Sequence, residues 1–371
     1  MSNKFYIGAS GGGKWFQSDC IPPDVLVLEN RYVLSSPVMK TMFWNNFNHC
    51  KIFGIRQIIT IDMWTPDRKE NPLGANPSEP ELRSIIKNIK DTLIAKGISS
   101  EMAVFQLDNE PAKYKVPMGI YCNWANIIYN ELGGAYKLYV GGDECLYVDW
   151  ITNVVYNCNC NGIAYHLQSC AKDISGTDIS INFINHLAVN CNLESLCSEG
   201  NYQDAQYDST YDMVLYHIKK CIEIGSSDYC VIFLHLKNQS KYEWLSFKYN
   251  DTKRGNYDEY LALCREFREV NRMVDQKDYN IPQVIMDFIN TVGLKEQPNY
   301  NPYLPILTSM FFQNDNYYHQ KTQNITKGDF DAFLERLMEF ITGEELNIYY
   351  DENGLWRTTA NRELITKSNP K

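Results

Sequence analysis

Short apolar runs alternate with amphipathic segments through the first 275 residues of the chain. Eight runs of four to seven residues predict strands: Phe5–Gly8, Val25–Glu29, Gln57–Asp62, Ala103–Asp108, Lys137–Val140, Gly162–His166, Leu193–Cys197 and Tyr229–His235. Segments with apolar residues at i, i+3 and i+4 predict helices: Met39–Phe53, Glu81–Ala95, Cys122–Leu132, Tyr147–Val155, Ile179–Val189, Thr210–Ile224 and Asp258–Val274. Strands that alternate with helices indicate a parallel sheet.

The number of strand–helix units favours a closed barrel. Eight units over about 275 residues fit a (β/α)8 TIM barrel, which typically takes about 250 residues. A doubly wound open sheet is the alternative, and eight units is long for it. The first connection, Ala9–Asp24, carries no helical pattern, so a different first unit is also conceivable.

The residue composition of the chain changes after about Asp275. Runs rich in Tyr, Asn and Pro appear, followed by a helical pattern at Asp329–Ile341. A hairpin is predicted next, with Ile348–Tyr350 and Leu355–Thr358 joined by Asp-Glu-Asn-Gly. We therefore expect a barrel domain over residues 1–275 and a small α+β accessory module over 276–371. This appendage would bind glycan, a protein or a cell-wall partner, or it would simply cover the barrel.

Composition and net charge argue against several classes of protein and of binding partner. A hydrophobic fraction of 44% and an aromatic fraction of 13% supply a sizeable core, so disorder is not indicated. The formal charge of −10 and the lack of a basic stripe argue against a nucleic-acid partner. No stretch approaches the ~20 apolar residues of a membrane span. The start shows no apolar leader, so the expected location is cytoplasmic, with release by lysis or virion association as alternatives.

The cysteines do not indicate a metal or disulfide scaffold. Twelve cysteines are too dilute for such a scaffold, and several lie inside strand-like or helix-like runs. Cys158-Asn159-Cys160 lacks the two-residue spacer and the second pair of a zinc site. Reduced, buried thiols and no metal are therefore predicted.

A glycine cluster after the first predicted strand invites a nucleotide-binding interpretation. The stretch FYIGASGGGKW approaches the P-loop pattern, but Trp15 stands where a Ser or Thr must hold Mg²⁺. The residues that follow do not predict the helix whose N-terminus would face the phosphates. The glycines are better explained as a tight turn at the end of the first strand. A nucleotide-binding α/β enzyme is retained as a weaker alternative.

Two carboxylates occupy the ends of separate predicted strands. The fourth strand ends in VFQLDNEP, which contains Asn109 and Glu110, and the seventh leads into ESLCSEGNY, which contains Glu199. In a barrel, reactive groups gather at the carboxyl ends of the strands. Glu110 and Glu199 are 89 positions apart, which corresponds to three units of about 30 residues. They can therefore face each other across one barrel mouth, as cleavage of a glycosidic bond requires.

With DNEP after strand four and SEG after strand seven, the chain resembles the glycoside hydrolases of clan A. The resemblance implies a retaining (β/α)8 enzyme without metal or organic cofactor. It implies that Glu110 is the acid/base, that Glu199 is the nucleophile and that Asn109 binds the sugar 2-hydroxyl. It covers residues 1–275 as an architecture, but only two short motifs as sequence.

Four further residues are candidates for substrate binding. Tyr165 and His166 close the sixth strand, where the clan often places a hydrogen-bond partner for the nucleophile. Trp64 follows the third strand and Trp244 lies beyond the eighth, and either could be a platform for a sugar ring. Each of the four could equally be an ordinary rim or core residue. Asp143 and Glu144, after the fifth strand, are rival carboxylates that the spacing places beside Glu110.

The sequence thus predicts a retaining glycoside hydrolase acting on a β-linked oligosaccharide or polysaccharide. The β linkage follows from the resemblance, because most members of the clan cleave equatorial bonds. The main alternative is a glycan-binding barrel without turnover, such as a surface or phage-tail component. The large number of tyrosines, 26, would suit that alternative as well.

Overall fold

The computed structural model describes residues 4–10, 21–201, 210–232, 234–236, 246–253, 256–276, 348–350 and 356–358. The chain forms two compact units, one of residues Phe5–Arg265 and one of Met1–Lys4 with Glu266–Lys371. Within the described ranges, no helix combines the length and the apolar character needed to cross a membrane.

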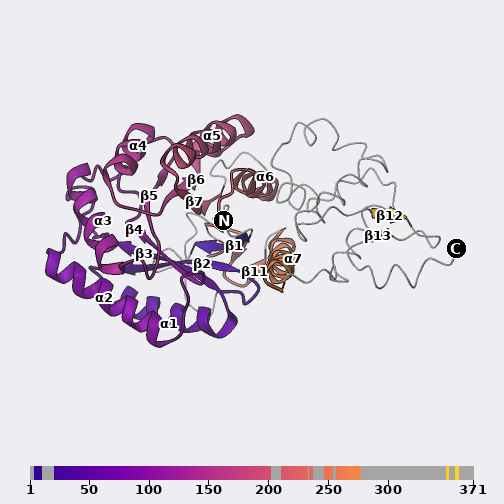
Figure 1. The fold of residues 1–371 in the computed structure, drawn as a ribbon, viewed down its shortest axis with the longest axis horizontal. Helices are drawn as coiled ribbons and strands as arrows, with labels where there is room; N and C mark the ends of the chain where they lie inside the picture. Colours follow the sequence, from indigo (N-terminus) through magenta and orange to yellow (C-terminus); the bar gives the residue numbers. More distant parts are fainter. Residues whose placement is uncertain are drawn as a thin grey trace. The chain divides into compact units, whose positions relative to one another are not determined.

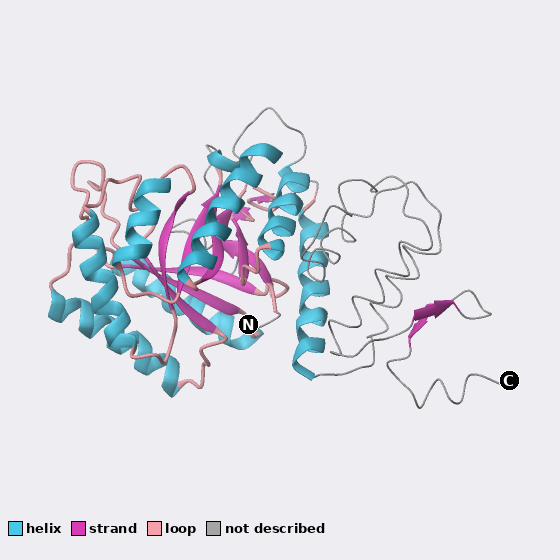
Figure 2. Cartoon of the chain, turned by 45° about the horizontal axis from the view of Figure 1, so that its top comes forward, coloured by secondary structure: helices cyan, strands magenta, loops and turns pink. Residues whose placement is uncertain are grey.

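The first unit is a closed barrel of eight parallel strands, drawn in Figures 1 and 2. The strands are β1 (Tyr6–Ser10), β2 (Val27–Val33), β3 (Arg56–Asp62), β4 (Ala103–Leu107), β5 (Leu138–Glu144), β6 (Gly162–Leu167), β7 (Glu194–Gly200) and β8 (Asp228–Val231). Each strand pairs with the next, and β1 pairs with β8 through the register Ile7 to Tyr229. The predicted (β/α)8 barrel is confirmed, and the doubly wound alternative is excluded.

Helices surround this barrel, as Figure 2 shows. They are α1 (Pro37–Phe53), α2 (Glu79–Ala95), α3 (Met118–Leu132), α4 (Val148–Asn157), α5 (Ile174–Cys191), α6 (Thr210–Glu223) and α7 (Tyr257–Gln276). A short 3-10 turn, η3 (Ser169–Ala171), precedes α5, and the short strands β9 (His235–Leu236), β10 (Lys248–Tyr249) and β11 (Thr252–Lys253) lie between β8 and α7. All seven predicted helices are present, with ends shifted by a few residues.

Local sequence signals explain where the helices begin and end. The Ser36 hydroxyl accepts a hydrogen bond from the Met39 amide, and Pro37 occupies the first helical position of α1. Gly54 ends the helix in the left-handed conformation. Ser78 and Glu81 form a capping box at the start of α2. These caps satisfy terminal backbone groups of α1 and α2, and the apolar residues of both helices, such as Phe47 and Ile86, are buried.

Gly8 allows the first two strands to approach closely. A side chain at this position would collide with the Val27 carbonyl, since an ideal Cβ would lie 1.8 Å from that oxygen. The Gly8 carbonyl in turn accepts a hydrogen bond of 2.6 Å from the Tyr260 hydroxyl on α7. The glycine within the P-loop-like stretch therefore serves strand packing. The glycines at 11–13, with Lys14 and Trp15, lie outside the described residues.

Polar side chains fill the floor of the barrel at the amino ends of the strands. Arg56 on β3 forms a bidentate ion pair with Asp228 on β8, with N–O distances of 2.7 and 3.2 Å. The guanidinium also lies over the Tyr6 ring at 5.0 Å, and the Tyr6 hydroxyl donates to Glu101 at 2.8 Å. Arg56 and Asp228 are buried, so this end of the barrel is closed by ionic and aromatic groups.

Replacing Arg56 with Met is expected to lower the free energy of unfolding by about 3–5 kcal/mol, because it leaves the buried Asp228 carboxylate without its counter-ion. Urea denaturation followed by circular dichroism measures the change. Lys87→Met is the control, since it breaks an exposed ion pair with Asp91 and should leave the free energy of unfolding nearly unchanged. Equal effects of the two substitutions would contradict the assignment of the Arg56 pair as structural.

The second unit contains the predicted hairpin. The strands β12 (Ile348–Tyr350) and β13 (Trp356–Thr358) pair antiparallel, with Tyr349 opposite Arg357. The predicted helix at Asp329–Ile341 lies outside the described residues. The proposed boundary after residue 275 and the role of the module stay predictions.

Candidate active site

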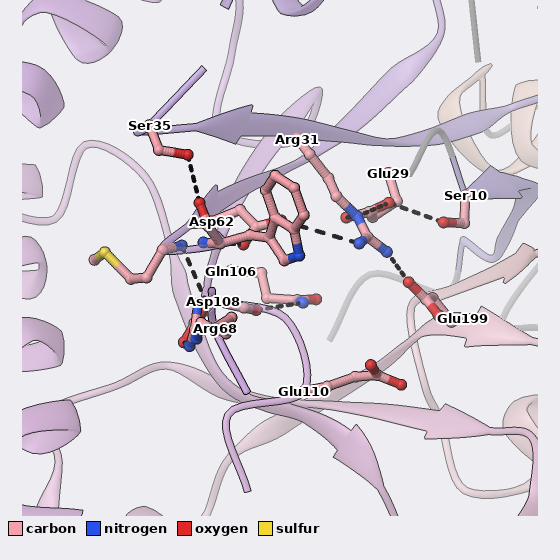
Figure 3. Close-up of polar contacts among 12 residues, drawn as sticks. Ser10, Glu29, Arg31, Ser35, Asp62, Arg68, Gln106, Asp108, Glu110 and Glu199 are labelled. Carbon is pink, nitrogen blue, oxygen red and sulfur yellow. Dashed lines mark hydrogen bonds and ion pairs between the residues drawn. The ribbon is translucent and has the colours of Figure 1, made fainter. Parts of the chain in front are cut away.

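Charged and polar side chains from six strands lie at the carboxyl end of the barrel, the mouth, and Figure 3 shows those of β2, β3, β4 and β7. The residues are Glu29 and Arg31 on β2, Asp62 on β3, Asp108 and Glu110 after β4, Asp143 and Glu144 on β5, His166 on β6, and Glu199 on β7. Both predicted catalytic carboxylates therefore belong to this group. Figure 3 shows Glu110 and Glu199 projecting into the space that also holds the Arg31 guanidinium.

Glu199 is held from two directions by hydrogen-bond donors. The Arg31 guanidinium contacts Oε1, and the Gln168 amide donates to Oε2 at 2.5 Å. The carboxylate is only 3% exposed. A charged donor on one oxygen and a neutral donor on the other fix the orientation of the carboxylate.

Arg31 is itself positioned by neighbours on the first two strands. Its Nε donates to both carboxylate oxygens of Glu29, at 2.8 and 3.1 Å. The Ser10 hydroxyl on β1 donates to Glu29 at 2.9 Å. Because Glu29 and Arg31 are two positions apart on one strand, both side chains point into the barrel. Burial opposes the charge of Arg31, but the Glu29, Asp62 and Glu110 carboxylates outweigh it and raise the pKa of Arg31.

Glu110 stands on a turn with unusual backbone geometry. Asp108 and Glu110 have φ angles of 60° and 54°, in the left-handed region that non-glycine residues rarely adopt. The Glu110 carboxylate accepts a hydrogen bond of 2.6 Å from the half-exposed Lys113 ammonium. Burial alone would lower the pKa of Lys113, but the Glu110 carboxylate outweighs it and raises that pKa. Lys113 therefore stays charged beside Glu110.

Asp108 anchors the strand end beneath this turn. Its Oδ1 accepts hydrogen bonds from the Met63 amide and from Arg68 Nη1, both at 3.1 Å, and its Oδ2 contacts Arg68 Nη2. Asp108 and Arg68 are both fully buried. The pair ties the end of β4 to the loop after β3, so Asp108 has a structural role next to Glu110.

The two rival carboxylates on β5 hold neighbouring loops. Asp143 accepts hydrogen bonds from the amides of Ala112 at 2.5 Å and Lys113 at 3.4 Å. Glu144 accepts from the Ser169 hydroxyl and from the Cys170 amide at 3.1 Å. Burial raises the pKa of Asp143 to about 8, even though the Ala112 amide works in the opposite direction. Asp143 is therefore largely protonated at neutral pH.

His166 lies behind Glu199 as a neutral ring. It is fully buried, and its Nδ1 is 3.8 Å from Glu199 Oε2. Burial, with Arg31 and Lys113 nearby, holds the pKa of His166 well below its usual value. Neither ring nitrogen has a hydrogen-bond partner among the described residues. An uncharged imidazole with unused polar atoms can hydrogen-bond a ligand that enters the mouth.

Asp62 contributes another perturbed carboxyl group at the end of β3. Its Oδ1 accepts a hydrogen bond of 2.8 Å from the Trp64 amide, and its Oδ2 is 4.0 Å from Arg31 Nη1. Burial raises the pKa of Asp62 to about 7; Arg31 opposes this shift and Asp108 adds to it. Because the folded state binds this proton more tightly than the unfolded chain, stability contributed by Asp62 is greatest below about pH 4 and is lost as the pH rises to about 7.

Asp62→Asn is accordingly expected to reduce the decline of stability between pH 4 and 7, since the amide cannot ionise and still accepts the Trp64 hydrogen bond. Urea midpoints measured across this range for the variant and the wild type test the effect. An unchanged dependence on pH would show that Asp62 is not the group responsible.

The other predicted binding residues have diverse positions. Trp64 is 38% exposed on the rim, and its carbonyl accepts a hydrogen bond from Ser35, so its backbone is fixed while its indole is accessible. Asn109 has a buried Oδ1 without a hydrogen-bond partner in the described part of the chain. Tyr165 is not brought to the mouth, because its hydroxyl lies 2.8 Å from Ser226 Oγ and 3.2 Å from Cys221 Sγ on α6. Trp244 lies outside the described residues.

The sequence did not lead us to predict Arg31, Gln168 and Lys113 as residues of the site. The predicted second strand ended at Glu29 and the sixth at His166, which left Arg31 and Gln168 in presumed loops. A signal for Arg31 was present, because the polar run Glu29-Asn30-Arg31 is followed at once by the apolar Tyr32-Val33. Lys113 is three positions after Glu110, a spacing that brings side chains together only where the chain turns.

Among the residues that the structure describes, no group of three or more His, Cys, Asp or Glu side chains is arranged to hold a metal ion.

Comparisons with known proteins place the fold. No protein-family model matches the chain. No curated protein matches its sequence. Solved structures do match: an endo-β-1,4-glucanase from Xanthomonas axonopodis pv. citri has a TM-score of 0.53 and 8% identity, covering 71% of this chain and 99% of that one. An endo-β-1,4-mannanase from Thermotoga petrophila has a TM-score of 0.51 and 11% identity, covering 72% and 77%.

A second endo-β-1,4-glucanase from Xanthomonas axonopodis pv. citri, carrying three substitutions, has a TM-score of 0.50 and 7% identity, with coverage of 71% and 99%. At such low sequence identity, these structural matches establish a shared fold only. The reaction has to be inferred from the residues at the site. In fold, the chain is a (β/α)8 barrel similar to those of these endo-β-1,4-glucanases and the endo-β-1,4-mannanase.

Proposed function

We propose that this chain is a retaining glycoside hydrolase that cleaves β-linked oligosaccharide or polysaccharide by double displacement. The observation that carries the proposal is the position of Glu110 and Glu199 at the ends of β4 and β7, with the Arg31 guanidinium bound to Glu199. Two carboxyl groups at one barrel mouth are the chemical requirement for this reaction.

In the first step, a Glu199 oxygen attacks the anomeric carbon and Glu110 donates its proton to the departing glycosidic oxygen. This geometry requires carboxyl groups ~5–5.5 Å apart in the working complex. The product of the step is a glycosyl ester on Glu199. In the second step, Glu110 takes a proton from water, and the water oxygen displaces Glu199 from the sugar.

The surrounding residues suit these steps. Arg31 and Gln168 keep Glu199 oriented, which reduces the entropy lost in reaching the transition state. Neutral His166 offers unused hydrogen-bonding atoms beside Glu199. The exposed indole of Trp64 provides an apolar face against which a sugar ring can stack.

The structural neighbours supply the first substrates to test. They are named as endo-β-1,4-glucanases and an endo-β-1,4-mannanase. We infer that β-1,4-linked glucans and mannans, together with their aryl glycosides, are the appropriate starting panel.

Release of reducing ends from soluble glucan and mannan, and of phenols from aryl β-cellobiosides and β-mannobiosides, tests the proposal. Proton NMR of the first product should show the β-anomer before mutarotation. An α-anomer would overturn the double-displacement mechanism. Binding of these polymers without any turnover would instead support the glycan-binding alternative.

A further inference from the structure

The turn that carries Glu110 is held by the neighbouring strand β5. The left-handed φ angles of Asp108 and Glu110 persist only where surrounding contacts enforce them. The Glu110 amide donates to the Gly142 carbonyl at 2.8 Å, and the next contacts along the turn are the Ala112 and Lys113 amides on the Asp143 carboxyl group. Three successive anchors of this turn therefore come from two adjacent residues of β5.

The shape of β5 explains how Asp143 reaches the turn. Gly141 and Gly142 have φ angles of 104° and 65°, and the β5–β6 register shifts between Gly141 and Asp143. Such a bulge redirects the side chains that follow it. Asp143 is thereby directed to the β4 turn, while Glu144 is directed to the loop after β6, where it contacts Ser169 and Cys170.

We propose that Asp143 is a positioning residue for the acid/base Glu110, acting through the backbone of Ala112 and Lys113. This inference rests on the proposed function and deepens it. Lys113 is part of the same device, because its amide contacts Asp143 while its ammonium contacts Glu110. Asp143 thus controls both the backbone of the turn and the side chain that pairs with Glu110.

A protonated Asp143 suits this role better than a charged one. Its raised pKa keeps a second negative charge away from Glu110 at neutral pH, while Oδ2 still accepts the Ala112 hydrogen bond. An asparagine is neutral and keeps one acceptor oxygen for the short Ala112 contact, giving up only the longer contact of 3.4 Å with the Lys113 amide, so it should replace Asp143 with little loss. Alanine removes the acceptor and should release the turn.

The test exploits the fact that acid assistance matters only for poor leaving groups. Values of kcat/KM are measured for phenyl and 2,4-dinitrophenyl β-glycosides of the sugar that the wild type cleaves. For Asp143→Ala, we expect about a 100-fold loss on the phenyl glycoside, a typical cost of misplacing a catalytic group by about 1 Å. The dinitrophenyl glycoside should be cleaved at nearly the wild-type rate. Asp143→Asn should behave nearly like the wild type on both, and Asp149→Asn, an exposed position in the first turn of α4, is the control.

Both substrates are measured on one sample, so partial unfolding lowers both rates equally and cannot imitate the expected result. Asp143→Leu, which keeps the number and branching of the side-chain heavy atoms but accepts no hydrogen bond, is measured in the same way if Asp143→Ala does not fold. Equal losses on the two substrates, or failure of Asp143→Asn to preserve the phenyl activity, would overturn the positioning role while leaving the glycosidase intact. A wild type that cleaves neither substrate would overturn the proposed function and this inference with it.

Discussion

Glu199→Gln is expected to reduce kcat by on the order of 10⁴- to 10⁶-fold, the range seen when a hydrolase loses its nucleophile or the residues that act with it. The amide keeps the shape of the side chain but cannot form the glycosyl ester. The companion measurement uses a 2-deoxy-2-fluoro glycoside with a dinitrophenyl leaving group, which should add one glycosyl mass to the wild type and none to the variant. Peptide mapping should place that label on Glu199.

The Glu199→Gln experiment needs a folding control, because Arg31 is paired with Glu199. The substitution removes the charge that Arg31 faces, so a matching circular dichroism spectrum and urea midpoint must accompany the kinetic result. A label on Asp143 or Glu144 would show that the nucleophile is on β5. Retention of more than a few per cent of wild-type kcat by folded Glu199→Gln would refute its assignment.

Glu110→Ala is expected to lower kcat/KM by about 10²- to 10⁴-fold on substrates with poor leaving groups, the usual contribution of general acid catalysis. The first step on a dinitrophenyl glycoside needs no proton, so the glycosyl enzyme should form but persist, because the base that activates water is gone. Steady-state KM should fall together with kcat, and a burst of dinitrophenol should precede the slow steady state.

Added azide provides the decisive comparison for Glu110. A small anion can occupy the space vacated by the carboxylate and attack the glycosyl enzyme without a base, so it should accelerate turnover and yield a β-glycosyl azide. Lys113 is left without its carboxylate partner in this variant, which favours the anion further. A variant insensitive to both azide and leaving group would show that Glu110 is not the acid/base.

The alternation of apolar runs with amphipathic segments was sufficient to predict the (β/α)8 barrel from the sequence. Eight apolar runs became eight strands in chain order, because the strands of a parallel barrel are covered on their outer face by helices and keep an apolar signal. The apolar pattern did not predict where the strands end at their carboxyl side. There β2 continues through Arg31 to Val33 and β5 through Gly141 and Gly142 to Glu144, since charged and glycine residues face the mouth and interrupt the apolar run.

The same effect limited prediction of the site. Motif spacing located Glu110 and Glu199, but their partners Arg31, Gln168 and Lys113 become neighbours only through closure of the barrel and the form of its loops. Tyr165 and His166 show how fine the distinction is, because adjacent residues of one strand point to opposite faces. One is directed to α6 and the other to Glu199, and a one-residue difference in the assumed register reverses the two.

The sealed floor around Arg56 and Asp228 has a kinetic consequence for the proposed reaction. In the part of the chain that the structure describes, the buried Arg56–Asp228 pair fills the amino end of the barrel, so we expect the detached aglycone and the incoming water to share the route at the carboxyl ends of the strands. The first fragment must therefore depart before hydrolysis is completed. An alcohol that lingers along this route would compete with water for the glycosyl enzyme, so added alcohols should divert the reaction toward transglycosylation.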